Sequence, residues 1–161
     1  MEEIKFTTGL KVYESAEALS AEDQALLAEA IKQLSFAYAP YSNFFVGSAV
    51  RTKSGKIFGG SNQENASYPL CMCAERVALY HAAAIVPTDP IVALAVVARN
   101  PKMKMDRPVM PCGACRQVII EYANRHETAI KLLFGDDCGK VYEMEKSHDL
   151  LPFIFDKSFL M

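Results

Sequence analysis

Three cysteines place the strongest constraint on how this chain can fold. Cys73 stands two residues before Glu75, and Cys112 and Cys115 follow 39 and 42 positions after Cys73. Two cysteines separated by two residues can grip a tetrahedral metal ion from one turn of chain, and Cys73 can add a third thiolate. The fold must then bring two distant segments together. Three protein ligands leave a fourth position open to water, and a carboxylate beside it suits a hydrolytic site.

A closed structural metal site is the alternative. Cys71 lies two residues before Cys73, so Cys71, Cys73, Cys112 and Cys115 make up a possible four-thiolate set. Such sites hold zinc for structural purposes and need no water or proton donor. The two interpretations therefore differ in whether Glu75 has a chemical purpose.

Hydrophobic periodicity predicts alternating helices and strands. Ser20 begins a capping-box pattern, and apolar residues then recur at helical spacing, including Ile31 and Tyr38, until Pro40 ends the run. Further helices are predicted over 73–86 and from Cys112 onward. Strands are predicted at 44–52, 56–62, 91–98, 129–134 and 140–144. This alternation indicates a layered α/β fold.

Helices that begin near Cys73 and Cys112 would place all three thiolates at helix N-termini. There the unpaired N–H groups and a dipole equivalent to roughly half a positive charge favour anions. Three thiolates around Zn²⁺ carry a net charge of −1, and Arg76 or Arg116 can withdraw part of it by donating to the sulfurs. The helix over 73–86 is apolar nearly all round, which predicts burial against a sheet or a partner subunit.

Composition sets limits on the class of protein. A chain of 161 residues that is 51% hydrophobic fits a single domain, on which we expect residues 1–19 to pack as an N-terminal extension. The first ten residues do not resemble a secretory signal, and the longest aliphatic run, 91–98, is far below the roughly 20 residues of a membrane helix. Five cysteines, an odd number, favour reduced thiols in the cytoplasm.

Charge and the remaining candidate ligands exclude further classes. A net charge of −2 provides no basic field for nucleic acid, and the basic residues between 99 and 107 are most simply a solvated loop. No histidine stands at a ligand spacing; the three are His81, His126 and His148. Cys138 falls in a predicted turn without a role.

Several ordered motifs carry a resemblance to a known family. They are Tyr41-Ser42-Asn43-Phe44 with Val46-Gly47, then Asn62-Gln63-Glu64-Asn65-Ala66-Ser67-Tyr68, then Cys73-Ala74-Glu75-Arg76, then Pro111-Cys112-Gly113-Ala114-Cys115-Arg116-Gln117. In this order and spacing they resemble the signatures of the cytidine deaminases, over about residues 20 to 156. The chain is similar to the small-subunit type with three cysteine ligands. The resemblance implies a three-layer α/β/α fold with a central mixed sheet of about five strands.

The resemblance also implies a reaction. Cys73, Cys112 and Cys115 would bind one Zn²⁺ per chain, and Glu75 would move protons from water to N3 and to the departing amino group of cytosine. The expected activity is hydrolytic deamination of cytidine and 2′-deoxycytidine to uridine and 2′-deoxyuridine plus ammonia, a step of pyrimidine salvage. Substrate contacts are expected from Phe44 on the ring, Asn62 and Glu64 on the ribose, the Ala74 N–H and a carbonyl near Met110 to Pro111 on the pyrimidine edge.

Relatives of this type resemble homotetramers with shared active sites. In that family the positions that match Ala66, Tyr68 and the C-terminal Phe155 cross the interface, although Phe153 is a second candidate for the last. No basic pocket for a phosphate is evident, which favours a nucleoside over a nucleotide. The alternatives are a deaminase of a modified cytosine nucleoside or of a polynucleotide, and a non-catalytic zinc module. The long, methionine-rich loop 99–110 is a further place where access to the site can differ.

Overall fold

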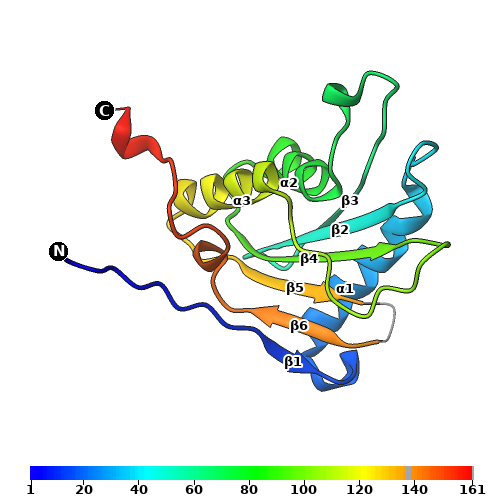
Figure 1. The fold of residues 1–161 in the computed structure, drawn as a ribbon, viewed down its shortest axis with the longest axis horizontal. Coiled ribbons are helices and arrows are strands. Elements are labelled where there is room, and N and C mark those ends of the chain that lie inside the picture. Colours follow the sequence, from blue (N-terminus) through cyan, green and yellow to red (C-terminus); the bar gives the residue numbers. More distant parts are fainter. Residues whose placement is uncertain (137–138, 161) are drawn as a thin grey trace.

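A mixed sheet of six strands organises the molecule (Figure 1), which we describe from a computed structural model covering residues 1–136 and 139–160. The strands lie in the order β1-β6-β5-β4-β2-β3. Their bounds are β1 Lys11–Tyr13, β2 Phe45–Thr52, β3 Ile57–Ser61, β4 Ile91–Arg99, β5 Lys131–Gly135 and β6 Val141–Met144. Strands β4 and β5 are parallel, and the other neighbouring pairs are antiparallel.

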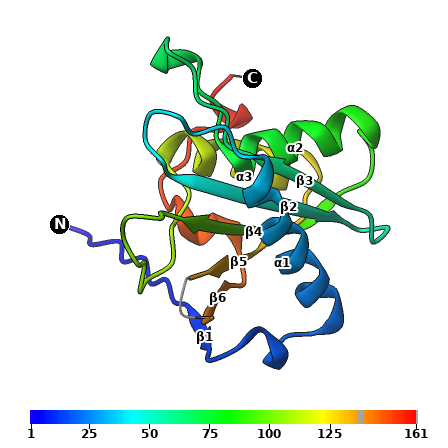
Figure 2. The same ribbon diagram turned by 90° about the vertical axis from the view of Figure 1, so that its right-hand side faces the viewer.

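Helices cover both faces of this sheet. The α-helices are α1 Ala21–Gln33, α2 Ala74–Ile85 and α3 Gly113–Arg125, with short 3₁₀ turns at Ala16–Ala18, Leu34–Phe36, Tyr68–Leu70, Ser147–Leu150 and Lys157–Phe159. Figure 2 shows α1 on one face, with α2 and α3 side by side on the other. The expected three-layer α/β/α architecture is therefore confirmed. Among the described residues, no helix has the length and apolar character needed to cross a bilayer.

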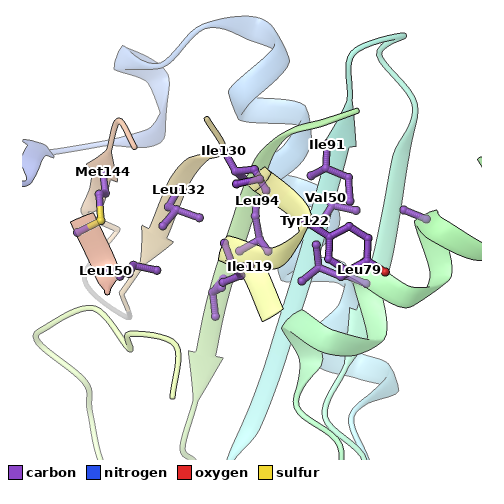
Figure 3. Close-up of a cluster of buried hydrophobic side chains, with 14 of the residues drawn as sticks. Val50, Leu79, Ile91, Leu94, Ile119, Tyr122, Ile130, Leu132, Met144 and Leu150 are labelled. Carbon is purple, nitrogen blue, oxygen red and sulfur yellow. The ribbon is translucent and has the colours of Figure 1, made fainter. Parts of the chain in front are cut away.

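Strand β4 supplies both hydrophobic cores. Leu94 and Val96 pack with α2 and α3, whereas Ala93, Ala95 and Val97 pack on the side of α1. Figure 3 shows the first core, in which Leu79, Ile119 and Tyr122 surround Leu94. Because successive side chains of a strand point to opposite faces, burial on both faces explains the continuous aliphatic run.

The sheet has six strands where about five were expected. The additional strand is β1, a three-residue segment of the N-terminal extension that pairs antiparallel with β6. Its pairing is supported by Lys11, whose Nζ lies 3.0 Å from Glu143 Oε1, and by the Tyr13 hydroxyl, which donates to Glu143 Oε2 at 3.2 Å. A strand of three residues is too short to show a clear alternating pattern in the sequence, whereas its partner β6 was predicted at 140–144.

The first helix is shorter than its periodicity predicts. Ser20 caps it as expected, since Ser20 Oγ accepts a hydrogen bond from the Asp23 N–H at 3.2 Å. The α-helix ends at Gln33 and continues only as the turn Leu34–Phe36. Ile31 and Tyr38, assigned to the apolar face, are 52% and 54% exposed. The helical spacing of apolar residues continues past Gln33, but residues such as Tyr38 lie on the surface of the single chain and do not pack on the sheet. The periodicity therefore overestimated the length of the helix.

Candidate metal centre and active-site cavity

Two helix N-termini bring the three predicted metal ligands together. Cys73 is the N-cap residue of α2, Cys112 is the N-cap residue of α3, and Cys115 lies in the first turn of α3. Their sulfur atoms lie within 4.8 Å of one another, with 3.9 Å between Cys73 and Cys112 and 3.5 Å between Cys112 and Cys115. In tetrahedral zinc sites, Zn–S bonds of about 2.3 Å place sulfurs about 3.8 Å apart. The three thiolates therefore fit one Zn²⁺.

Cys71 lies outside this cluster. Its sulfur accepts a hydrogen bond from the Asn65 N–H at 3.2 Å, and its thiol is 3.6 Å from the Asn65 carbonyl oxygen. Within residues 1–136 and 139–160, the cysteines that gather as possible metal ligands are Cys73, Cys112 and Cys115 alone. The structure thus gives three protein ligands, not the closed set of four.

Glu75 is buried beside the cluster. It lies in the first turn of α2, two residues after Cys73, and is only 5% exposed. Burial is the largest cause that raises the pKa of Glu75 above its ordinary value, and the negative charge on Cys73 raises it further. A raised pKa brings a carboxyl group closer to the range in which it can both accept and release a proton.

The two candidate arginines have different partners. Arg76 Nη2 donates to Cys73 Sγ at 3.5 Å. A hydrogen bond from the Cys115 thiol, with help from Arg76, lowers the pKa of Cys73 to about 5 despite its partial burial. Arg116 does not donate to a sulfur: its Nε donates to the Pro111 carbonyl at 2.8 Å and its Nη1 to the Leu150 carbonyl at 3.1 Å. The expectation for Arg116 was wrong because its side chain turns toward backbone oxygens.

A cavity of about 280 Å³ opens beside the cluster. Its walls come from β2 and the residue before it, the β3–α2 connection, the start of α2, β4 and the loop before α3. They include Phe44, Val46, Asn62, Gln63, Glu64, Cys71, Met72, Cys73, Ala74, Glu75, Val96, Val109, Met110 and Cys112. A mostly apolar hollow with a few convergent polar groups is the usual form of a small-molecule site.

Asn62 and Glu64 also order the chain around this cavity. Asn62 Oδ1 accepts from the Val46 N–H at 2.8 Å, and its Nδ2 donates to the Phe44 carbonyl at 2.9 Å. Glu64 Oε2 accepts from the Tyr41 N–H at 2.8 Å, and the Ser42 hydroxyl donates to Oε1. The hydrogen bond from Ser42 is the main cause that lowers the pKa of Glu64. Both side chains are thus held in place at the cavity wall.

Comparisons with known proteins agree with this geometry. Residues 20–129 match the model of the cytidine and deoxycytidylate deaminase zinc-binding region. A cytidine deaminase of Halalkalibacterium halodurans is 45% identical over 132 residues, which is 82% of this chain and 92% of that protein. The chain belongs to the cytidine deaminase family.

A solved structure and a deaminase named for a different substrate extend the comparison. The crystal structure of cytidine deaminase from Burkholderia pseudomallei superposes with a TM-score of 0.72 and 43% identity, and covers 81% of this chain and 97% of that one. A blasticidin-S deaminase of Bacillus cereus is 31% identical over 107 residues, 65% of this chain and 76% of that protein. The zinc-binding region and the three-cysteine cluster together fit one zinc ion per chain.

Three residues that the family resemblance places at the site are not at the cavity of this single chain. Tyr68 is 69% exposed and packs edge-on against Tyr41, with 5.9 Å between ring centroids, and Ala66 is also exposed. Phe155 is 59% exposed and stacks on Phe159 at 5.7 Å. Tyr68 instead lines a neighbouring hollow of about 320 Å³, which shares Glu64 and Cys71 with the cavity.

The histidines take no part in the metal cluster. His81 Nδ1 lies 3.2 Å from the Gly59 carbonyl, and His148 Nε2 lies 3.0 Å from Asn124 Oδ1. His126 ends α3 as its C-cap residue. The predicted turn position of Cys138 lies outside the described residues.

Proposed function

We propose that this protein is a zinc-dependent hydrolase that converts cytidine and 2′-deoxycytidine to uridine and 2′-deoxyuridine, with release of ammonia. The observation that carries the proposal is the place of Glu75. Its buried carboxyl group stands beside three convergent thiolates, and it lines a cavity whose wall also holds Asn62 and Glu64. A purely structural zinc module has no use for a buried acid in a substrate-sized hollow.

Glu75 would carry both protons of the reaction. Cys73, Cys112 and Cys115 would hold the zinc ion, which would supply activation of the attacking water. The oxygen of this water becomes O4 of the product. Glu75 accepts a proton from this water and passes it to N3 of the ring. It then transfers the second proton to the departing amino group, so that ammonia leaves and the water is fully accounted for. The raised pKa of Glu75 supports its use first as a base and then as an acid.

The surrounding residues would bind and orient the nucleoside. We assign Phe44 to the face of the ring, the Ala74 N–H to the pyrimidine edge, and Asn62 with Glu64 to the ribose hydroxyls. Arg76, which donates to Cys73 Sγ, would draw negative charge from the three-thiolate cluster. A ligand without the sugar would lack the contacts with Asn62 and Glu64, whose side chains are already positioned by hydrogen bonds within the chain, so it should react poorly.

The decisive experiment compares two variants of neighbouring residues. Glu75→Gln should retain one zinc per chain and lose nearly all deamination of cytidine, because the amide cannot exchange a proton. Cys71→Ala, the matched control, should keep both the zinc and the activity because Cys71 lies outside the cluster. Zinc is measured by elemental analysis and turnover by the change in ultraviolet absorbance. Full activity of Glu75→Gln, or loss of zinc from Cys71→Ala, would refute the proposed site.

A substrate panel separates this function from its alternatives. Cytidine and 2′-deoxycytidine should be deaminated, whereas cytosine, CMP, blasticidin S and a short single-stranded DNA should react far more slowly. Preferential turnover of blasticidin S or of the DNA would instead support a deaminase of a modified nucleoside or of a polynucleotide. No turnover of any compound by the zinc-loaded protein would support a structural module.

We also propose that residues 1–161 act as a single domain and that the protein is located in the cytoplasm. We further propose a homotetramer with shared active sites. The support for the homotetramer is the set of exposed residues that a single chain leaves outside its own cavity: Ala66, Tyr68 and Phe155. Tyr80 and Ile85 of α2 are also exposed, at 44% and 62%, in a helix whose nearly uniform apolar character predicts burial against a sheet or a partner subunit. A mass near four times the 17.8 kDa chain in light scattering is the expected result.

A further inference from the structure

Arg116 joins two backbone carbonyls that belong to distant parts of the chain. Its Nε donates to the carbonyl of Pro111 at 2.8 Å, and its Nη1 donates to the carbonyl of Leu150 at 3.1 Å. No carboxylate among the described residues lies within ion-pair distance of Arg116. The guanidinium is half-buried, and its charge is directed to these two oxygens. Such charge-assisted hydrogen bonds are among the stronger ones in proteins.

One of these carbonyls directly precedes Cys112, a metal ligand whose own side chain is exposed. Cys115 is fully buried in the first turn of α3, so its sulfur is placed by the helix and the core. Cys112 is exposed and is the N-cap residue, without a side-chain capping hydrogen bond. The position of the Cys112 sulfur therefore depends on the backbone that leads into α3. The Pro111 carbonyl is the point at which Arg116 holds that backbone.

The other carbonyl belongs to a firmly placed segment. Leu150 is 5% exposed and is part of the core that α2 and α3 form on the sheet (Figure 3). It ends the turn Ser147–Leu150, which follows β6 and packs against α3. Beyond it, Gln117 Nε2 donates to the Phe155 carbonyl at 2.7 Å, so the next residue of α3 holds the chain farther along. Leu150 thus offers Arg116 a fixed point in the core.

We propose that Arg116 is a positioning residue, which fixes the Pro111 to Cys112 backbone against Leu150 and thereby holds Cys112 as a zinc ligand. The segment after β6 then supports the metal site although it contains no ligand. Arg116 does not act on the sulfurs or on the substrate. The effect on zinc follows from the metal cluster alone, and only the kinetic effect rests on the proposed function.

The experiment compares the zinc-loaded protein with four variants. Zinc release is followed by transfer to a chromogenic chelator, together with the thermal unfolding midpoint and kcat and KM for cytidine. Arg116→Gln removes the charge and one of the two donors, and Arg116→Lys keeps the charge. Gln117→Ala removes only the contact with Phe155. Asp23→Asn removes an ion pair with Arg51 at α1, on the opposite face of the sheet, and should lower stability without reaching the metal cluster, so it serves as the control for stability.

Arg116→Gln should release zinc about tenfold faster than the unaltered protein, in line with the usual effect of residues that orient metal ligands. Arg116→Lys should fall between the two, and Gln117→Ala and Asp23→Asn should release zinc at the original rate. Unchanged zinc release in Arg116→Gln would overturn the proposal. The proposal would also be overturned if Asp23→Asn, at the same fall in the thermal unfolding midpoint, released zinc as fast as Arg116→Gln. If the unaltered protein fails to deaminate cytidine, the proposed function falls, but the zinc measurement still tests Arg116.

Discussion

Glu64 both orders a loop and lines the cavity. Its carboxylate accepts hydrogen bonds from the N–H groups of Tyr41 and Ser42 and from the Ser42 hydroxyl. These bonds link the turn before β2 to the β3–α2 connection. The same carboxylate lines the cavity. A side chain held in this way loses less conformational entropy when a ligand binds, which is a form of preorganisation.

Removing the Ser42 hydroxyl should therefore affect both the order of the loop that Glu64 holds and the placement of its carboxylate at the cavity wall. In Ser42→Ala the pKa of Glu64 should rise toward its ordinary value of 4.5, because its largest lowering contribution is lost. A lowered pKa favours the folded state above the pKa of the unfolded chain, and this advantage disappears as the pH falls through the folded pKa. The variant should thus lose stability at neutral pH and little at strongly acid pH. Carbon-13 NMR of the glutamate carboxyls gives the pKa, and KM for cytidine should rise severalfold.

Ser54→Ala is the matched control for this substitution. Ser54 makes the same type of contact with Asp89 and lowers the pKa of that carboxylate, and neither residue lines the cavity. Its pKa effect should appear at Asp89 with no change in KM. A Ser42→Ala variant with the original pKa of Glu64 would contradict the assigned hydrogen bonds.

At the scale of elements, glycines allow helices to approach the sheet closely enough to place the site. A Cβ added at Gly60 of β3 would contact the backbone N of Ala78 and stand 2.7 Å from the carbonyl oxygen of Ala74, both in α2. Ala74 immediately follows the ligand Cys73 and precedes Glu75. The distance between β3 and the start of α2 therefore helps to set the position of the metal ligand and the acid.

Gly60→Ala should displace the start of α2. Because the added methyl group meets backbone rather than a flexible side chain, we expect a loss of about 2 to 3 kcal/mol in the free energy of unfolding. Zinc binding should weaken with it, since Cys73 moves with the helix. Gly9→Ala is the control because nothing lies within 4 Å of a Cβ at Gly9. Urea unfolding of both variants checks the prediction, and equal stability of the two would show that β3 and α2 are less closely packed.

Across the whole molecule, a nearly buried charge cluster joins the layer of α1 to the sheet. Asp23 of α1 is 3% exposed and pairs with Arg51 of β2, at 3.3 Å between Oδ1 and Nη2, and with Lys131 of β5. Glu22 adds a pair to Arg51 at 3.0 Å near the surface. The cluster connects one helix with two strands that are not adjacent in the sheet.

Asp23→Asn should destabilise the entire fold without altering the site. Neutralising Asp23 leaves the largely buried guanidinium of Arg51 without its inner partner, and breaking a buried pair costs about 3 kcal/mol or more. Glu22→Gln, which removes only the exposed partner, should cost about 0.5 kcal/mol. Denaturant unfolding measures both, and kcat for cytidine should stay the same in each. A loss in Glu22→Gln as large as in Asp23→Asn would contradict this assignment.

The sequence by itself determined the local patterns and the reactive groups. Cys73, Cys112 and Cys115 at helix starts, with Glu75 in the first turn of α2, were predictable because caps, turns and ligand spacings are properties of neighbouring residues. The aliphatic run of β4 predicted a strand buried on both faces, because this pattern is also a property of neighbouring residues. These features depend on short stretches of chain, which a single sequence displays directly.

Only the tertiary structure decided how distant segments share one site. Strand β1 and the hydrogen bond from Arg116 to Leu150 depend on contacts between residues far apart in the chain. The exclusion of Cys71 depends on how the segments that carry Cys73, Cys112 and Cys115 meet in the fold. Hydrophobic periodicity does not report such contacts. The partner of a three-residue strand such as β1, or of a guanidinium such as that of Arg116, is whichever group the folded core brings near. The three cysteines and Glu75 could therefore be named from the sequence, while the support that holds Cys112 in place emerged from the fold alone.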